Sequence, residues 1–260
     1  MESMRCPKCN FEQSENRSEC IKCGVVFEKY LPKKNQYPEN PVISFSASTP
    51  IISEKRLHYG AFLKEFLFGV ESEVHILYFL GRLMVFILLV TWGIKFISSP
   101  METNYSGQSF MHLINLPFHE AGHLIFRIFG QFIMTMGGSL MQLLVPLICL
   151  LTFLVKTRDT FAASVSLWWL AENFMDLAPY INDARDLKLI LLGGVTGQDV
   201  DDFHDWQYIL RNMGLLRYDH LLAHTMQMIG IALMIGACAW GGLLLFKQFR
   251  ILRSAQGFDR

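Results

Sequence analysis

The stretch FIMTMGGSLMQLLVPLICLLTFLV, residues 132–155, decides the fold class of this 260-residue chain. Its 24 residues include no charged side chain. A helix of about 20 apolar residues is long enough to cross the hydrocarbon core of a bilayer. The stretch therefore predicts a transmembrane helix, and with it a membrane protein.

Three further apolar runs lie on either side of this stretch, at residues 76–97, 160–181 and 221–246. The first contains Arg82 and Lys95 near its two ends, from which long basic side chains can reach the membrane surface. These runs predict an all-α multi-pass membrane protein with about four to five membrane segments.

The overall charge balance excludes one class of partner. Lys and Arg total 23, and Asp and Glu also total 23, so the net charge is zero. A general nucleic-acid binder needs a basic field, so we expect no nucleic-acid partner. Hydrophobic residues make up 52% of the chain and charged residues 18%, which excludes disorder as the dominant state. We expect the lipid bilayer to be the main environment.

Four cysteines near the N-terminus form two CxxC pairs, Cys6 with Cys9 and Cys20 with Cys23, and ten residues separate the pairs. Two such turns can offer four thiolates to one tetrahedral zinc ion, and a site with four cysteines is closed and therefore structural. We predict a small zinc ribbon over residues 1–30 that contacts a protein partner. Paired CxxC motifs without an apolar leader indicate a reducing compartment, hence a cytoplasmic N-terminus.

Residues 31–56 contain four prolines among polar residues and read as a flexible linker. Residues 57–75 place apolar side chains at helical spacing, which predicts an amphipathic helix on the membrane surface. An extension of the next helix is the alternative. Residues 76–260 then form the membrane domain, in which 182–220 is a polar loop.

The apolar segment 110–130 contains the sequence HEAGH at residues 119–123. Pro117 suits the first turn of a helix, so we expect a helix over 117–129, which is too short to cross a bilayer. If this segment is re-entrant, the N-terminus, Lys156 and the C-terminal basic residues share the cytoplasmic side and the acidic loop faces outward. We prefer this arrangement, in the plasma membrane, to one in which the segment crosses.

The HEAGH sequence carries the functional prediction. On a helix, His119 and His123 share one face and can bind one zinc ion, while Glu120 can take a proton from water beside it. Two interfacial histidines with a surface glutamate are the alternative. An open catalytic zinc site needs a third protein ligand. The best source is the segment 168–186, which places carboxylates in or beside an apolar run.

HEAGH on an apolar helix, followed by Asn173, Pro179 and Asp183 on a later membrane segment, resembles the site-2 protease family of intramembrane zinc metalloproteases. The resemblance covers about residues 110–190. It implies that Asp183 is the third zinc ligand and that Asn173 helps to hold the oxyanion. Asp183 lies two residues farther from Asn173 than in the family, and Asp176 stands where the family has proline. Asp176 is therefore the alternative third ligand.

Two further segments leave alternatives open. Glu172 and Asp176 together resemble the third-ligand motif of membrane gluzincin proteases. The loop 197–206 is rich in Asp and His; it is either a solvated acidic loop or brings His204 or Asp205 over the site, in the second shell or as a ligand. Residues 131–139 are either an extended edge that holds substrate or a glycine-rich helix start.

These observations predict a zinc-dependent intramembrane or membrane-proximal endopeptidase with one catalytic and one structural zinc ion. Glu120 is the expected general base, and a membrane protein or peptide is the expected substrate. A membrane scaffold or a metal-handling protein that uses the zinc ribbon for partner contact is the alternative.

Overall fold

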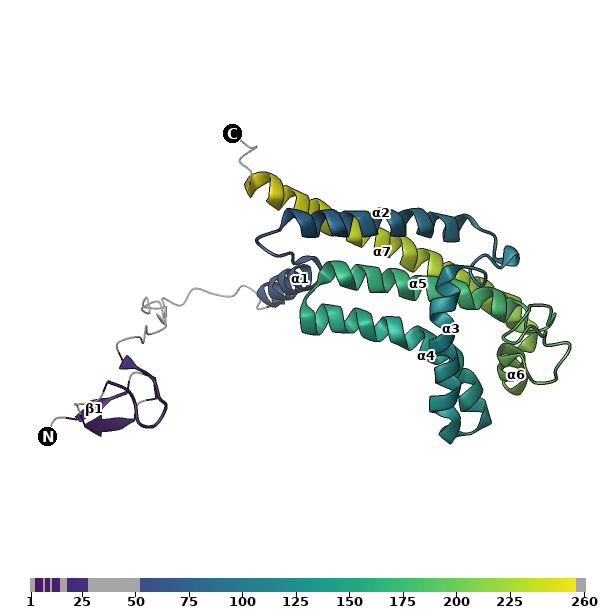
Figure 1. Ribbon diagram of the computed structural model, residues 1–260, viewed down its shortest axis with the longest axis horizontal. Helices are drawn as coiled ribbons and strands as arrows, with labels where there is room; N and C mark the ends of the chain where they lie inside the picture. The colour runs from purple at the N-terminus through teal and green to yellow at the C-terminus, as the bar shows by residue number, and fades with distance from the viewer. Residues whose placement is uncertain (1–2, 7, 10, 15–17, 28–51, 256–260) are drawn as a thin grey trace. The chain divides into compact units, whose positions relative to one another are not determined.

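The computed structural model describes residues 3–6, 8–9, 11–14, 18–27 and 52–255. The chain divides into two compact units, Met1–Pro50 and Ile51–Arg260 (Figure 1). Most of the predicted linker, residues 31–51, lies outside the described residues. Residues 52–56 already belong to a helix, so the predicted linker extends too far along the chain.

The N-terminal unit is built from two cysteine turns and a short hairpin. Strand β1, Ser3–Arg5, pairs antiparallel with β2, Glu12–Ser14. The Gln13 side chain joins the hairpin to the second turn: its amide donates to Glu19 O at 3.1 Å and accepts from Ile21 N at 3.1 Å. Gly24 has a φ of +68°, a conformation that glycine adopts without strain.

The second unit is helical (Figure 1). Its α-helices are α1 Ile52–Phe68, α2 Ile76–Ser98, α3 Phe110–Phe126, α4 Gln131–Thr152, α5 Thr160–Asn182, α6 Asp205–Asn212 and α7 Asp219–Ala255. Short turns are η2 Met101–Thr103, η3 Arg127–Phe129, η4 Phe153–Thr157 and η5 Leu216–Tyr218. Within the described part of the chain, three helical segments are long and apolar enough to cross a membrane: Ile76–Ser98, Gln131–Thr157 and Leu216–Ala255.

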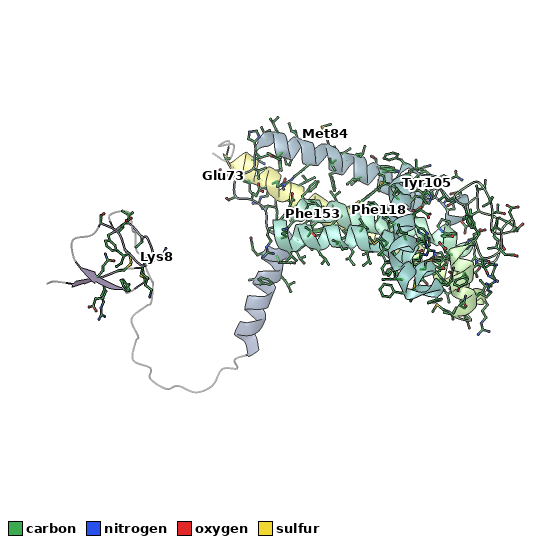
Figure 2. All side chains as sticks on the ribbon, turned by 60° about the horizontal axis from the view of Figure 1, so that its bottom comes forward. Lys8, Glu73, Met84, Tyr105, Phe118 and Phe153 are labelled. Carbon is green, nitrogen blue, oxygen red and sulfur yellow. The ribbon has the colours of Figure 1, made fainter. Side chains whose placement is uncertain are left out.

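These long helices expose apolar side chains on their outer faces. On α2, Leu77, Met84 and Leu88 are 69%, 72% and 58% exposed, and Figure 2 shows Met84 pointing away from the bundle. Exposing so much continuous apolar surface to water is unfavourable in free energy, whereas contact with lipid tails is not. The exposed faces therefore agree with a membrane protein.

Helix α5 forms the centre of the bundle, between α4 and α7 (Figure 1). Trp168 and Met175 on α5 pack with Phe96 of α2 and Met234 of α7. The same helix carries Glu172, whose side chain is fully buried. The surrounding helices thus shield the polar groups of α5 from lipid, because an ionisable group facing hydrocarbon is costly.

Helix α1 is anchored by its last carbonyl groups. Leu67 O accepts from Trp240 Nε1 at 2.8 Å, Phe68 O from Lys247 Nζ at 2.8 Å, and Gly69 O from Thr160 Oγ1 at 2.9 Å. The helix ends there, before the seven residues that the predicted range of 57–75 also included, and α2 begins separately at Ile76. The alternative, in which this segment simply extends α2, is therefore wrong.

Helix α3 crosses the direction of the long helices in Figure 1. It begins at Phe110, seven residues before the predicted start, because Ser109 caps it by accepting from His112 N at 3.3 Å. Pro117 consequently lies inside the helix rather than in its first turn. Residues 131–139 belong to α4, so the helix-start alternative holds and the extended edge is wrong.

Candidate metal centres

Close packing of α3 against α4 shapes the first candidate site. A Cβ atom added to Gly122 would collide with the backbone carbonyl of Gly137. The two helices therefore approach so closely that only glycine fits at this position. Gly138, one residue farther along α4, faces the HEAGH histidines. A Cβ atom there would lie 2.5 Å from His123 Nε2 and 2.6 Å from His119 Nε2. Gly138 therefore leaves a space between the two rings.

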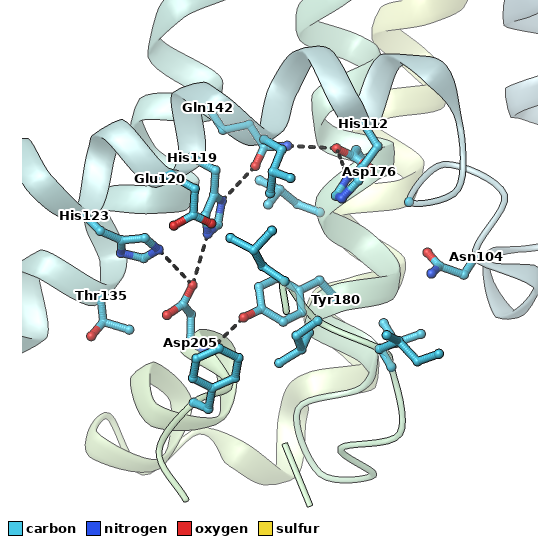
Figure 3. A pocket seen from close by; sticks show the side chains of 18 of the residues that line it. Asn104, His112, His119, Glu120, His123, Thr135, Gln142, Asp176, Tyr180 and Asp205 are labelled. Carbon is cyan, nitrogen blue, oxygen red and sulfur yellow. Dashed lines mark hydrogen bonds and ion pairs between the residues drawn. The ribbon is translucent and has the colours of Figure 1, made fainter. Parts of the chain in front are cut away.

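The two histidines share one carboxylate partner across this space (Figure 3). His119 Nε2 lies 3.0 Å from Asp205 Oδ2, and His123 Nε2 lies 3.2 Å from the same oxygen. All three ligand atoms lie within 4.8 Å of one another. Ligand atoms around a tetrahedral zinc ion are about 3.3 Å apart, given bonds of about 2.0–2.1 Å. The group could therefore hold a metal ion.

Hydrogen bonds on the far side of each ring orient the histidines for metal binding. His119 Nδ1 lies 3.0 Å from Gln142 Oε1, and His123 Nδ1 lies 3.0 Å from Met134 O. Both partners are oxygen acceptors, so each Nδ1 is the donor and each Nε2 faces the shared space. This arrangement fixes the tautomer that a metal requires.

A buried carboxylate fixes the orientation of Gln142 in turn. The Gln142 amide donates to Asp176 Oδ2 at 3.0 Å, which turns its Oε1 toward His119. Asp176 also accepts from Asn115 at 3.0 Å and lies 3.0 Å from His112 Nδ1. The predicted alternative ligand Asp176 thus reaches the metal site through Gln142, not directly.

Asp205 is the first residue of α6 and is held there by its neighbours. Its backbone N–H donates to the Tyr180 hydroxyl at 3.0 Å. His204 caps α6, since its Nδ1 accepts from Gln207 N at 3.2 Å, and its ring lies 4.3 Å from the Tyr180 ring. Burial alone would raise the pKa of Asp205, but hydrogen bonds from His119 and His123 lower it to about 2. The carboxylate is therefore ionised at neutral pH, as a metal ligand must be.

The structure places Asp183 in a structural role. Its two carboxylate oxygens accept from Lys188 N and Leu189 N, each at 2.9 Å, and His204 Nε2 lies 3.5 Å from Oδ2. Burial opposes ionisation, but these contacts lower the pKa of Asp183 below its usual value. The group that could hold a metal ion consists of His119, His123 and Asp205, and Asp183 is not part of it.

Asn173 also lies away from the histidine group. Its amide donates to Trp169 O at 2.9 Å, the residue is fully buried, and it does not line the cavity beside the histidines. Glu172 is likewise fully buried and accepts from Asn115 at 2.9 Å. The motif positions inferred from the site-2 protease resemblance therefore do not converge with HEAGH in this fold.

A cavity of about 540 Å³ opens beside the histidine group. Glu120, Tyr180 and Asp205 lie on its wall, together with His112, His119 and His123 (Figure 3). Its apolar lining comes from Leu116, Met134, Leu177, Leu189, Ile190, Leu191, Leu192 and Phe203. The site can thus accept an apolar ligand group beside a polar, metal-binding wall.

Three residues around the histidine group, Gly138, Gln142 and Tyr180, are hard to recognise as site residues from the sequence. Gly138 and Gln142 sit in an apolar run, and Tyr180 is an aromatic residue in a buried helix. Only the periodicity of α4 could have hinted at the first two, since Gly138 and Gln142 are four residues apart and share one face. The dense Asp/His loop did single out Asp205.

The second candidate centre is the cysteine group of the N-terminal unit. Cys6 Sγ lies 3.7 Å from Cys23 Sγ, and Cys9 Sγ lies 3.7 Å from Cys20 Sγ. Zinc–sulfur bonds of about 2.3 Å in a tetrahedron place sulfur atoms about 3.8 Å apart. All four sulfur atoms lie within 4.8 Å of one another, so the group could hold one metal ion.

No family model, curated protein or solved structure matches the chain in comparisons of its sequence and fold.

Proposed function

We propose that the chain is a membrane-bound zinc peptidase whose catalytic metal is held by His119, His123 and Asp205. One observation carries the proposal: two Nε2 atoms and one carboxylate oxygen converge on the wall of a cavity that also contains Glu120. A Cβ atom at Gly138 would lie 2.5 and 2.6 Å from the two Nε2 atoms, and the far side of each histidine is already hydrogen-bonded.

Glu120 supplies the acid–base chemistry in this proposal. Its neighbour in sequence is the ligand His119, and its exposed side chain lines the cavity. A zinc ion held by His119, His123 and Asp205 would supply a Lewis acid that lowers the pKa of bound water. Glu120 accepts a proton from water as the water oxygen attacks the peptide carbonyl carbon, then gives the proton to the amide nitrogen as the C–N bond breaks. The products are a carboxylate and an amine.

Tyr180 takes the role that the family resemblance would give to Asn173. The Tyr180 oxygen accepts from Asp205 N at 3.0 Å, and its hydroxyl group lies on the cavity wall. The oxygen of the peptide carbonyl becomes negatively charged during attack, and a positioned hydroxyl donor stabilises that charge. Asn173 is buried and bonded to Trp169 instead.

The membrane arrangement in this proposal has four crossing helices, α2, α4, α5 and α7, with α3 lying at one end. Helix α5 is as long as α2, with 23 residues each, and its polar groups are enclosed by the other helices. The substrate is a membrane protein or a membrane-bound peptide. The cysteine unit holds a structural zinc ion and contacts a protein partner.

Hydrolysis of a quenched fluorescent peptide library by the purified full-length protein tests the proposal. Glu120→Gln removes the base but leaves every metal ligand in place. We expect the unchanged chain to cleave members of the library, and the variant to keep its metal and lose cleavage. Equal cleavage by both proteins, or none by the zinc-loaded unchanged chain, would favour the scaffold or metal-handling alternative.

A further inference from the structure

The four long helices of the bundle share two ends, which differ in charge. At one end, called the basic end here, α2 and α5 begin and α4 and α7 finish (Figure 1). Contacts tie this end together: Arg82 Nη2 lies 3.1 Å from Asp159 Oδ2, and Lys247 donates to Phe68 O. By sequence, residues 52–82, 156–160 and 247–255 hold nine Lys and Arg against five Asp and Glu.

The opposite end, called the acidic end, carries the candidate metal centre. Residues 95–127 and 172–219 hold six Lys and Arg against eleven Asp and Glu. Three of the six basic side chains are bound to carboxylates: Arg185 to Asp219, Lys188 to Asp186, and Arg211 to Asp202. Short loops rich in Lys and Arg stay on the cytoplasmic side of a membrane, so the basic end faces the cytoplasm.

The cysteine unit gives an independent assignment of the same side. Its chain continues into α1, and the end of α1 is hydrogen-bonded to Trp240, Lys247 and Thr160 at the basic end. By sequence, residues 24–51 contain no apolar run of the length that crosses a bilayer. The sequence between the cysteines and α1 therefore includes no membrane crossing. Cysteine thiolates persist as metal ligands in a reducing compartment, which is the cytoplasm.

The length of helix α5 gives the distance between the two ends. Thr160 bonds to Gly69 at the basic end, and Tyr180 lies on the wall of the metal-site cavity. The 20 residues between these positions span about 30 Å at 1.5 Å per residue. That length equals the hydrocarbon thickness of a typical bilayer, about 30 Å. The cavity thus lies a full membrane thickness from the basic end.

From these observations we infer that the candidate metal centre opens on the face of the membrane opposite the basic end, outside the cytoplasm. Resting on the proposed peptidase function, the substrate class is a polypeptide segment that lies at the outer membrane surface. The cavity rim fits such a substrate, because Ile190 and Leu192 are 78% and 55% exposed beside the acidic loop. An apolar rim next to charged residues is typical of a surface that meets the membrane boundary.

Cysteine labelling in intact cells tests the side directly. Asp201→Cys places a thiol in the exposed acidic loop, and Ser254→Cys places a matched exposed thiol at the basic end. The full-length variants are treated with a membrane-impermeant maleimide before and after permeabilisation, and labelling of the unchanged chain is subtracted. We expect Asp201→Cys to react in intact cells and Ser254→Cys to react only after permeabilisation. Reaction of Ser254→Cys in intact cells, or protection of Asp201→Cys there, overturns the inference.

A second measurement tests the substrate class separately from the peptidase proposal. A library peptide that the detergent-purified chain cleaves is added outside sealed right-side-out vesicles that contain the full-length protein. We expect the same cleavage rate before and after the vesicles are permeabilised. Cleavage that begins only after permeabilisation overturns the inference but leaves the peptidase proposal standing. Loss of the peptidase proposal itself leaves the labelling result unaffected.

Discussion

At the scale of the residue, Gly138 decides whether the two histidines can share an ion. A Cβ atom at this position would occupy the space between their Nε2 atoms, at 2.5 and 2.6 Å. We predict that Gly138→Ala removes the membrane-unit metal and leaves the cysteine-unit metal, as measured by metal content per purified chain. Gly236→Ala is the matched control, because a Cβ atom there meets nothing within 4 Å. Full metal content in Gly138→Ala would mean that the ion does not lie between the rings.

Asp176 acts on the site through one intermediate side chain. Replacing it with asparagine removes the carboxylate that orients the Gln142 amide, so His119 loses its fixed tautomer. Outer hydrogen-bond partners of this kind contribute about 10–100-fold to metal affinity. We predict that Asp176→Asn weakens zinc binding in the membrane unit by about that factor, measured by competition with a chelator.

Glu172→Gln is the control for this prediction. Glu172 is buried on the same helix and also contacts Asn115, but it has no hydrogen bond to Gln142 among the described contacts. Its replacement should leave zinc affinity unchanged. Equal weakening in both variants would indicate general disruption of α5 and remove the positioning role of Asp176.

A substitution at Tyr180 tests the catalytic role of the site separately from metal binding. Tyr180→Phe removes the hydroxyl donor proposed for the oxyanion, and removing one such donor typically costs about 10²–10³-fold in kcat. We predict a decrease of about that size in kcat, with KM and zinc content nearly unchanged, on any library peptide that the unchanged chain cleaves. A loss of zinc in parallel with activity would instead show that the hydroxyl matters only by holding Asp205 N.

At the scale of the element, the contact between α3 and α4 depends on Gly122 and Gly137. A methyl group at Gly122 would press on the Gly137 carbonyl, which is backbone and cannot turn aside. Overpacking of this kind costs about 1–3 kcal/mol in the free energy of unfolding. We predict that Gly122→Ala lowers the thermal unfolding midpoint in detergent, whereas Gly81→Ala, with nothing within 4 Å, does not. Equal midpoints would contradict the close helix contact.

Most helices could be predicted from the sequence because their signal is local. The run 160–181 became α5, Thr160–Asn182, and the run 76–97 became α2, Ile76–Ser98. Long apolar runs leave a helix as the only way to satisfy the backbone inside a membrane. The start of α3 was missed since one capping residue, Ser109, outweighed the usual placement of proline at a first turn.

The third member of the histidine group could not be predicted in the same way. Asp205 lies 82 positions after His123 and reaches it through a loop whose path is set by distant contacts, such as Tyr180 with Asp205 N. The resemblance to the site-2 protease family implied Asp183, four residues after Pro179 on the chain. Asp183 instead closes its own loop by accepting from Lys188 N and Leu189 N.

At the scale of the whole molecule, the chain has two groups of side chains that could each hold a metal ion, one in each unit. The cysteine group lies within Met1–Pro50, and the histidine group lies within Ile51–Arg260. Because neither group borrows a ligand from the other unit, each metal should be lost independently. Cys20→Ser should therefore remove one ion and leave the other.

The most direct test of the account is the zinc content of the purified full-length protein compared with Asp205→Ala and Asp183→Ala. The account predicts two zinc ions in the unchanged chain, one in Asp205→Ala and two in Asp183→Ala, because only Asp205 shares the space between His119 and His123. Two ions in Asp205→Ala together with one in Asp183→Ala would contradict it, and would return the third ligand to the position that the family resemblance implied.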